Sequence, residues 1–200
     1  MRLHETPIVV FEEFLSASEL ESLHNFVARH HLDFVVSTVL GKDGKVVDET
    51  SRRSRVLYHV GEYDSLFRRR IRHFLPLILH RLRLSMSSIA AFEVQLTATN
   101  DGEFFGAHTD SDDGILSTRT VTFVYYCHLE PRRFRGGELQ IYGRDPVSGR
   151  DVTNARHIIK PTQNSIVFFP SDRLHEITPV ICPSKAFLDS RFTVNGWLRR

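Results

Sequence analysis

The stretch AFEVQLTATNDGEFFGAHTD, residues 91–110, carries the most information about the fold. From Phe92 to Thr99 its even-numbered positions are apolar and its odd-numbered positions are polar. This period of two predicts a β-strand over Ala91–Thr99 with apolar residues on one face and polar residues on the other. The stretch ends in His108-Thr-Asp110. Because side chains at i and i+2 of an extended segment project to the same side, His108 and Asp110 can grip one metal ion together.

Short apolar runs separated by glycine and proline follow this strand. Gly136-Gly137 and the prolines at 146, 161, 170 and 183 fall in the gaps between them. The runs predict strands at Arg119–His128, Glu138–Tyr142, His157–Lys160, Ser165–Phe169, His175–Val180 and Arg191–Leu198.

The residues that precede this strand-rich half have helical periodicity. Ser16 and Glu19 form a capping-box signature, and apolar residues recur at helical spacing after them. A second helix is predicted over Ser65–Phe74, which Pro76 is expected to break or restart. Helices followed by about seven strands indicate an α+β fold, a sandwich or barrel covered on one side by helices.

Residues 37–55 are polar and punctuated by glycine. Gly41-Lys-Asp-Gly44 predicts a turn between two short strands. The segment suits either a flap that covers a substrate or an ordinary surface loop, and the sequence leaves both open.

Composition limits the class of protein. With 200 residues, 41% hydrophobic and 25% charged, we expect a single globular domain over 1–200. The net charge of +2 gives no support for a nucleic-acid partner. No apolar run approaches the roughly 18 residues that span a bilayer, and residues 1–10 do not read as a signal peptide. A cytoplasmic enzyme with no membrane partner is therefore predicted. Cys127 and Cys182 could form one disulfide, although two free buried thiols are the commoner case in a reducing cytosol. The oligomeric state is left open.

A third metal ligand must come from elsewhere, and His175 is the best candidate. It begins a predicted strand, directly after Phe168-Phe169-Pro170. Two histidines and one carboxylate form the facial triad of non-haem iron(II) oxygenases, which leaves coordination positions open. Taken alone, each part is a weak signal, because the chain has 11 histidines. His108-Thr-Asp110 also suits a turn, and His175 also suits a capping or surface position.

The order of several motifs resembles the prolyl 4-hydroxylase-like branch of the 2-oxoglutarate/Fe(II)-dependent dioxygenase superfamily. These motifs are Asn100-Asp-Gly-Glu-Phe-Phe-Gly-Ala-His108-Thr-Asp110, Arg119-Thr-Val-Thr-Phe-Val-Tyr-Tyr126, Phe134-Arg-Gly-Gly-Glu-Leu139, Asn164-Ser-Ile-Val-Phe-Phe-Pro170, His175-Glu-Ile-Thr-Pro-Val180 and Arg191-Phe-Thr-Val-Asn-Gly-Trp197. The resemblance implies a double-stranded β-helix, or jelly-roll, core over 89–198, with helical support from 1–85 packed on the major sheet.

The resemblance also implies the chemistry. His108, Asp110 and His175 would be the catalytic iron(II) ligands. The reaction would hydroxylate an unactivated C–H bond with O2 and convert 2-oxoglutarate to succinate and CO2, with ascorbate as an optional further cofactor. Relatives that halogenate substrates have a small residue in place of this carboxylate, so the presence of Asp110 favours hydroxylation.

Four residues are implied to contact 2-oxoglutarate. Arg191 matches the basic residue that binds the far carboxylate, a role that suits a planar guanidinium. Thr193, two positions along the same strand face, would add a hydroxyl, and Tyr126 matches a cosubstrate-binding tyrosine. Thr99 stands where many relatives carry a tyrosine, so one expected contact would be replaced by Thr99, with Thr97 or Gln95 on the same polar face.

The substrate and two rival classes of protein are left open. The substrate is either a prolyl or other residue in a peptide, or a free or carrier-bound small molecule. Two arginine clusters, 52–55 and 132–135, suit either an acidic substrate group or a solvated surface. The rivals are a cupin-like metal-binding barrel that does not use 2-oxoglutarate, which would not need a buried Arg191, and a non-catalytic binding module.

Overall fold

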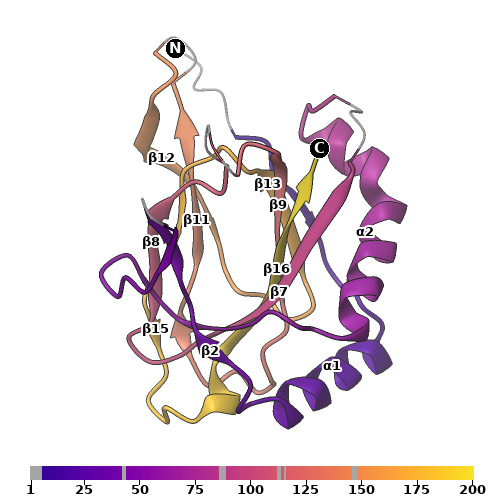
Figure 1. The fold of residues 1–200 in the computed structure, drawn as a ribbon, viewed down its shortest axis with the longest axis vertical. Helices are drawn as coiled ribbons and strands as arrows, with labels where there is room; N and C mark the ends of the chain where they lie inside the picture. The colour runs from indigo at the N-terminus through magenta and orange to yellow at the C-terminus, as the bar shows by residue number, and fades with distance from the viewer. Residues whose placement is uncertain (1–5, 42–43, 86–88, 112–113, 115, 146–147) are drawn as a thin grey trace.

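The computed structural model describes residues 6–41, 44–85, 89–111, 114, 116–145 and 148–200. Within them, the chain is mostly β-sheet with two α-helices (Figure 1). A seven-stranded sheet and a five-stranded sheet contain most of the strands, and every pairing is antiparallel. Two further pairs of short strands lie at the periphery.

The seven-stranded sheet has the order β1 (Val9–Phe11), β13 (Ile166–Pro170), β9 (Arg119–Tyr126), β16 (Arg191–Arg199), β7 (Ala91–Thr99), β6 (Arg55–Leu57) and β2 (Val35–Val36). The five-stranded sheet has the order β12 (Asp151–Ile159), β11 (Leu139–Arg144), β14 (His175–Ile177), β8 (Phe104–His108) and β5 (Arg52–Arg53). The short pairs are β3 (Val39–Gly41) with β4 (Gly44–Val46), and β10 (Arg135–Gly136) with β15 (Val180–Ile181).

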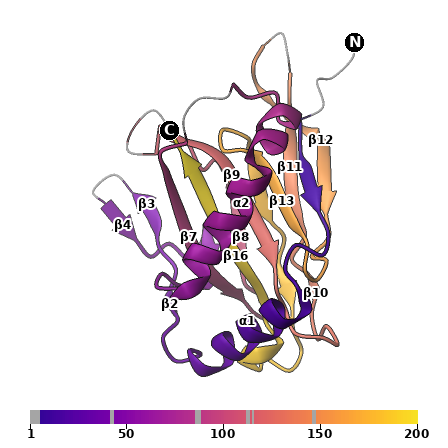
Figure 2. The ribbon, with the colours of Figure 1, turned by 90° about the vertical axis from the view of Figure 1, so that its right-hand side faces the viewer.

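Of the two helices, α2 (Glu62–Arg81) packs along the outer face of the seven-stranded sheet, and α1 (Ala17–Arg29) lies at the lower end of that face against the start of α2 (Figure 2). A short 3-10 turn covers Phe187–Asp189. Phe67 of α2 is fully buried and its ring lies 6.3 Å from that of Phe123 and 5.1 Å from that of Tyr125. The main hydrophobic core therefore lies between helices and sheet, so the opposite face of this sheet is available to line a cavity.

The predicted capping box of α1 is confirmed. Ser16 accepts a hydrogen bond from the Glu19 backbone N–H, and the Glu19 carboxylate accepts one from the Ser16 N–H. The prediction that Pro76 interrupts the second helix is wrong, because α2 runs through it. Pro76 lies on the exposed side, where water can satisfy the carbonyl that loses its helical partner, while Ile78 and Leu79 are buried and hold the following turn.

The predicted strands are present, and the largest difference is at β12, which begins at Asp151, six residues before the predicted start at His157. β7 has the predicted bounds, and the strand predicted over His175–Val180 divides into β14 and the start of β15 around Pro179, which has no N–H to donate. The first half contains more strand than its helical periodicity predicts, because β1, β2 and β6 join the seven-stranded sheet. The two strands predicted within 37–55 form the β3–β4 hairpin, which projects from the body in Figure 2, and the centre of its turn lies outside the described residues.

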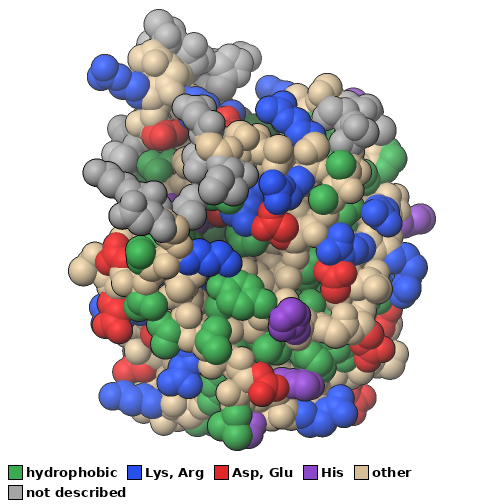
Figure 3. Space-filling view, viewed as in Figure 1, with side chains coloured by type: hydrophobic (Ala, Val, Ile, Leu, Met, Phe, Trp, Pro, Cys, Tyr) green, Lys and Arg blue, Asp and Glu red, His purple; other side chains and the backbone are tan. Residues whose placement is uncertain are grey.

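Cys127 and Cys182 are both buried free thiols, as predicted. Basic and acidic side chains are interspersed on the face seen in Figure 3. Among the helices of the described ranges, none combines the length and the apolar character needed to cross a bilayer.

Candidate metal centre and cosubstrate cavity

The three predicted metal ligands lie together. Because β14 pairs with β8, His175 lies directly opposite His108, and the two imidazole ring centres are 4.2 Å apart. Asp110, just beyond β8, has its carboxylate oxygens 3.6 Å from His108 Nε2 and 3.4 Å from His175 Nε2. The candidate ligand atoms all lie within 4.8 Å of one another. One ion can therefore reach all three side chains.

Backbone carbonyls orient both imidazoles. His108 Nδ1 lies 2.8 Å from the Gly106 carbonyl oxygen, and His175 Nδ1 lies 2.8 Å from that of Arg173. A carbonyl only accepts hydrogen bonds, so each Nδ1 must carry the proton. Each Nε2 then presents its lone pair to the space beside Asp110, which is the tautomer that a metal ligand needs.

Asp110 is held as a carboxylate. Burial by itself would raise its pKa, but the His175 and His108 imidazoles, when they carry a proton on Nε2, hold the pKa well below its usual range. The Thr122 hydroxyl donates to Asp110 at 2.8 Å, and the Asp110 backbone N–H donates to the Ser171 carbonyl. Burial, with His175 nearby, lowers the pKa of His108 and favours its neutral form. A neutral imidazole beside a carboxylate is a donor set that suits a divalent transition metal.

Sequence reasoning missed the residues that support the triad. Thr122 shares strand parity with Tyr126 on β9, a signal that could have placed it in the cavity. The Phe105 ring stacks on His108 with centres 3.5 Å apart, and the Phe169 ring meets His175 edge-on at 4.8 Å. These two phenylalanines shield the imidazoles from water.

Arg191 lies in the same cavity and is almost completely buried, with 2% of its surface exposed. Its Nε donates to the Gly137 carbonyl at 2.7 Å, while its Nη2 has no hydrogen-bond partner among the described residues. Glycine is required at 137, because a Cβ there would lie 2.5 Å from Arg191 Cδ. A buried guanidinium with a free donor is costly unless an anion pairs with it. The cavity is therefore suited to a carboxylate.

The other predicted cosubstrate contacts surround Arg191. Thr99 faces it across β7 and β16, and Thr193 follows two positions along β16; both are buried and line the cavity. Tyr126 faces Thr193 from β9, its ring centre lies 5.2 Å from Arg191 Cζ, and its hydroxyl has no partner among the described residues. Burial raises the Tyr126 pKa, so the phenol keeps its proton and can donate.

The two polar neighbours considered as substitutes for the missing tyrosine differ in their availability. The Thr97 hydroxyl donates to Asn195 at 2.8 Å, so its proton is already engaged. Gln95 is buried and lines the cavity.

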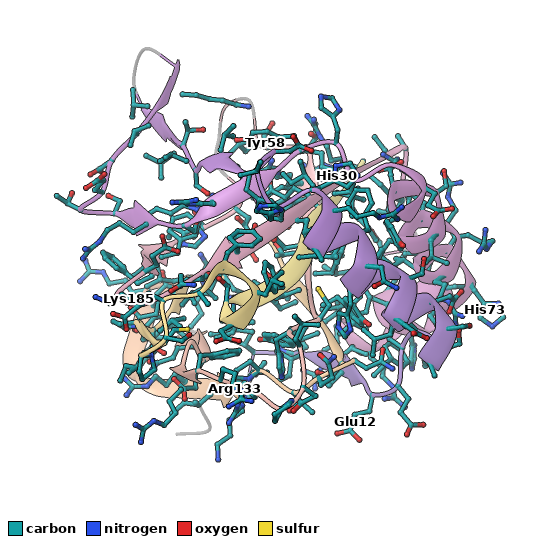
Figure 4. The ribbon with its side chains drawn as sticks, turned by 90° about the horizontal axis from the view of Figure 1, so that it is seen from below. Glu12, His30, Tyr58, His73, Arg133 and Lys185 are labelled. Atoms are coloured by element: carbon teal, nitrogen blue, oxygen red, sulfur yellow. The ribbon has the colours of Figure 1, made fainter. Side chains whose placement is uncertain are left out.

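The two arginine clusters differ in the structure. Arg52 lines the cavity, whereas Arg53 and Arg55 are exposed. Arg132, Arg133 and Arg135 are all exposed, and Arg133 lies at the periphery in Figure 4.

The fold and the site define a β-sheet protein with a candidate metal centre of two histidines and one carboxylate beside a buried guanidinium. Comparison with known proteins gives the family. A family model for the 2OG-Fe(II) oxygenase superfamily matches residues 94–199, just over half of the chain. The chain belongs to that superfamily.

Individual relatives support this assignment. An uncharacterized PKHD-type hydroxylase from Synechocystis sp. is 35% identical over 188 residues, which cover 89% of this chain and 62% of that protein. The chain therefore spans less than two thirds of that relative's length. Among solved structures, a Pseudomonas putida prolyl-4-hydroxylase superimposes with a TM-score of 0.68 at 20% identity, over 98% of this chain and 93% of the other. A Trichoplax adhaerens prolyl hydroxylase, solved with a hypoxia-inducible-factor peptide, gives 0.71 at 17% identity, over 97% and 84%. These two structures share the fold.

Proposed function

We propose that this chain is an Fe(II)- and 2-oxoglutarate-dependent hydroxylase. Its reaction would hydroxylate an unactivated C–H bond of a prolyl or other amino-acid-type substrate and release succinate and CO2. The observation that carries the proposal is that His108, Asp110 and His175 converge within 4.8 Å in the same cavity as Arg191, whose buried Nη2 has no hydrogen-bond partner among the described residues. The prolyl-hydroxylase names of the solved neighbours motivate the substrate class.

In this proposal the strands of residues 89–198 in the two sheets form the walls of a jelly-roll core, and the strands from the first half extend the edges of those sheets. Residues 1–85 support it, and the whole of 1–200 forms one catalytic domain. This division is consistent with the family match over 94–199 and with the packing of α2 along the seven-stranded sheet and of α1 against the start of α2.

Each residue has a separate role. His108 and His175 would donate Nε2, and Asp110 a carboxylate oxygen, to one ferrous ion, so that coordination positions stay open for cosubstrate and O2. When bound, the iron and 2-oxoglutarate supply the oxidising chemistry. Arg191 would pair with the far carboxylate of 2-oxoglutarate through its forked N–H groups, and Thr193 would add a hydroxyl.

The same cavity keeps water away from the reacting atoms. Val124 and Leu139 line it with apolar surface, and Phe105 lies against His108. Tyr126 and Thr99 would complete the polar end, close to Arg191. A cupin-like site without 2-oxoglutarate gives no reason to bury an unpaired guanidinium, so Arg191 favours the oxygenase over that alternative.

The test measures succinate formed from 2-oxoglutarate with iron(II), O2 and ascorbate, together with +16 Da products from candidate peptides and amino acids. Asp110→Ala and His175→Ala should lose iron-dependent succinate formation and keep the circular dichroism of the folded chain. Asp172→Ala is the matched control, because Asp172 is exposed and pairs with Arg144 at 3.1 Å. Wild-type succinate rates in the Asp110 or His175 variant would disprove the ligand assignment.

A further inference from the structure

A second guanidinium, that of Arg52, lines the metal cavity. Arg52 lies on β5 opposite Phe105, and its Cζ stands 4.6 Å from the centre of the Phe105 ring. That ring stacks on His108 at 3.5 Å. Arg52 Cζ is therefore no farther than about 8 Å, the sum of these spacings, from the His108 ring centre.

The side chain of Arg52 is held in place without being neutralised. Its Nε donates to the Ser54 hydroxyl at 2.9 Å, and Ser54 donates in turn to Ser37 at 2.8 Å. Within the described ranges, no ion pair joins Arg52 to a carboxylate. Burial lowers the pKa of this half-buried guanidinium, and Asp110, the carboxylate that most favours its charge, is the proposed metal ligand and forms no ion pair with it. An anion that enters beside Phe105 would supply the missing partner.

Strand order separates Arg52 from the proposed cosubstrate end. In the five-stranded sheet, β14 with His175 and β8 with His108 lie side by side between β11 and β5. Arg191 contacts Gly137 beside the start of β11, whereas Arg52 belongs to β5, the sheet edge. The two guanidiniums thus flank the candidate metal centre. If the far carboxylate of 2-oxoglutarate pairs with Arg191, Arg52 remains available to contact the substrate.

A groove of about 1050 Å³ continues outward from Arg52, past Trp197, to the β3–β4 hairpin. Sites that enclose a drug-sized molecule measure about 300–1,000 Å³, so this groove has room for several residues of an extended peptide. The hairpin that lines it projects from the body in Figure 2.

Four cations and four carboxylates line the described part of the groove, so the position of each charge decides what it can bind. Asp64 is bound by Arg68, and Glu93 by Arg119. Asp48 accepts hydrogen bonds from neighbouring hydroxyl groups, which hold the pKa of its carboxyl at about 2. In the described part of the groove, Arg52 and Lys45 are the cations without an ion-paired carboxylate, and Lys45 lies over the Tyr58 ring at 5.1 Å.

We propose that Arg52 is a substrate-binding residue that selects a peptide with a carboxylate side chain within two positions of the oxidised residue. The spacing follows from the geometry, because consecutive Cα atoms are about 3.8 Å apart and the guanidinium lies within about 8 Å of His108. A free amino acid would leave most of the groove empty. This inference rests on the proposed hydroxylase activity.

The experiment uses proline-containing peptides in matched pairs that differ only by Asp or Asn at one of the two positions on either side of the proline. Free proline and free glutamate are included. Substrate-dependent succinate formation and +16 Da products are measured for the wild-type chain. A charge-assisted hydrogen bond should make kcat/KM for at least one Asp peptide about tenfold or more higher than for its Asn partner.

Arg52→Gln should reduce that ratio to about one, chiefly through a higher KM for the Asp peptide. Arg52→Lys, which keeps the charge without the fork, should keep part of the preference. Arg53→Gln is the matched control, because Arg53 is the exposed neighbour on β5, and it should keep the full ratio. Thermal unfolding of each variant checks that it is folded.

Three results would overturn the inference: equal turnover of every Asp and Asn pair by the wild-type chain, an unchanged ratio in Arg52→Gln, or turnover of the free amino acids alone. Iron-dependent succinate formation by the wild-type chain without peptide tests the proposed function separately. If that succinate forms and the Asp preference is absent, the Arg52 inference fails and the proposed function stands.

Discussion

Replacing Arg191 with methionine should stabilise the folded chain and weaken its binding of 2-oxoglutarate. Methionine is also long and unbranched, so the cavity wall keeps much of its packing. The side chain removed is a cation that is 2% exposed, and no ion-paired carboxylate accompanies it among the described residues. Stability should rise while affinity for 2-oxoglutarate falls, so a general loss of folding cannot produce both results.

The magnitudes follow from the contacts. Burying a cation without a partner costs several kcal/mol, whereas the hydrogen bond to Gly137 contributes about 1 kcal/mol. Arg191→Met should therefore gain on the order of 1–3 kcal/mol, and Tm should rise by roughly 2–4 °C for each kcal/mol gained. Loss of hydrogen bonds to a charged group, worth about 1.5–3 kcal/mol, should raise the Kd for 2-oxoglutarate by roughly 10- to 150-fold.

The assay is thermal unfolding with and without 2-oxoglutarate and a divalent metal, under anaerobic conditions, with Kd from titration calorimetry. Arg199→Met is the matched control on the same strand. Arg199 pairs with Glu93 at 3.0 Å, so its loss should lower stability by about 1 kcal/mol or less and leave 2-oxoglutarate affinity unchanged. A wild-type Kd in Arg191→Met, or a large loss of stability there, would refute the assignment of Arg191 as an unpaired cation awaiting a carboxylate.

Three further predictions test the support of the site and the fold. Thr122→Val removes the hydroxyl that donates to Asp110 and should weaken iron(II) affinity by about 10-fold or more at nearly unchanged stability; unchanged affinity by metal titration would contradict it. Burial lowers the pKa of His128 to about 4, so the unfolded chain binds more protons than the folded chain below about pH 6.5. Acidification therefore destabilises the folded chain, and His128→Gln should reduce that loss of stability. Urea unfolding should show the wild-type chain losing up to about 2 kcal/mol more than this variant between pH 7 and pH 5, with the exposed His73→Gln behaving as wild type. Phe67→Ala should cost about 3–5 kcal/mol in chemical denaturation and Leu77→Ala, 40% exposed on the same helix, under about 1 kcal/mol; equal costs would mean that α2 is not held by its buried face.

The residues that support the three candidate ligands are as informative as the ligands themselves. Two imidazoles and a carboxylate are common side chains, and 11 histidines make chance pairings frequent. Their convergence gains meaning from the carbonyls of Gly106 and Arg173, which select one tautomer, and from the hydroxyl of Thr122. These contacts orient donors toward a common point, as a metal centre requires.

Local signals in the sequence predicted much of the fold. The alternation from Phe92 to Thr99 predicted β7, and Ser16 with Glu19 predicted the start of α1, because strand periodicity and helix capping depend on neighbouring residues. The spacing of His108 and Asp110, at i and i+2, likewise predicted that their side chains project to the same side. His175 was the best third ligand because it begins a predicted strand, and the resemblance of ordered motifs to a known family strengthened that choice and identified Arg191 as their companion.

Tertiary structure decided what depends on contacts between distant segments. Pairing of β14 with β8 brings His175 opposite His108, and no property of either segment specifies that register. Burial of Ile78 and Leu79 keeps α2 helical beyond Pro76, against local propensity. On β5, at the edge of the five-stranded sheet, Arg52 lines the cavity and Arg53 is exposed, although the two are adjacent in sequence. Packing between elements selects one arrangement among many that local preferences allow, and in this chain it gathers the charges around the candidate metal centre.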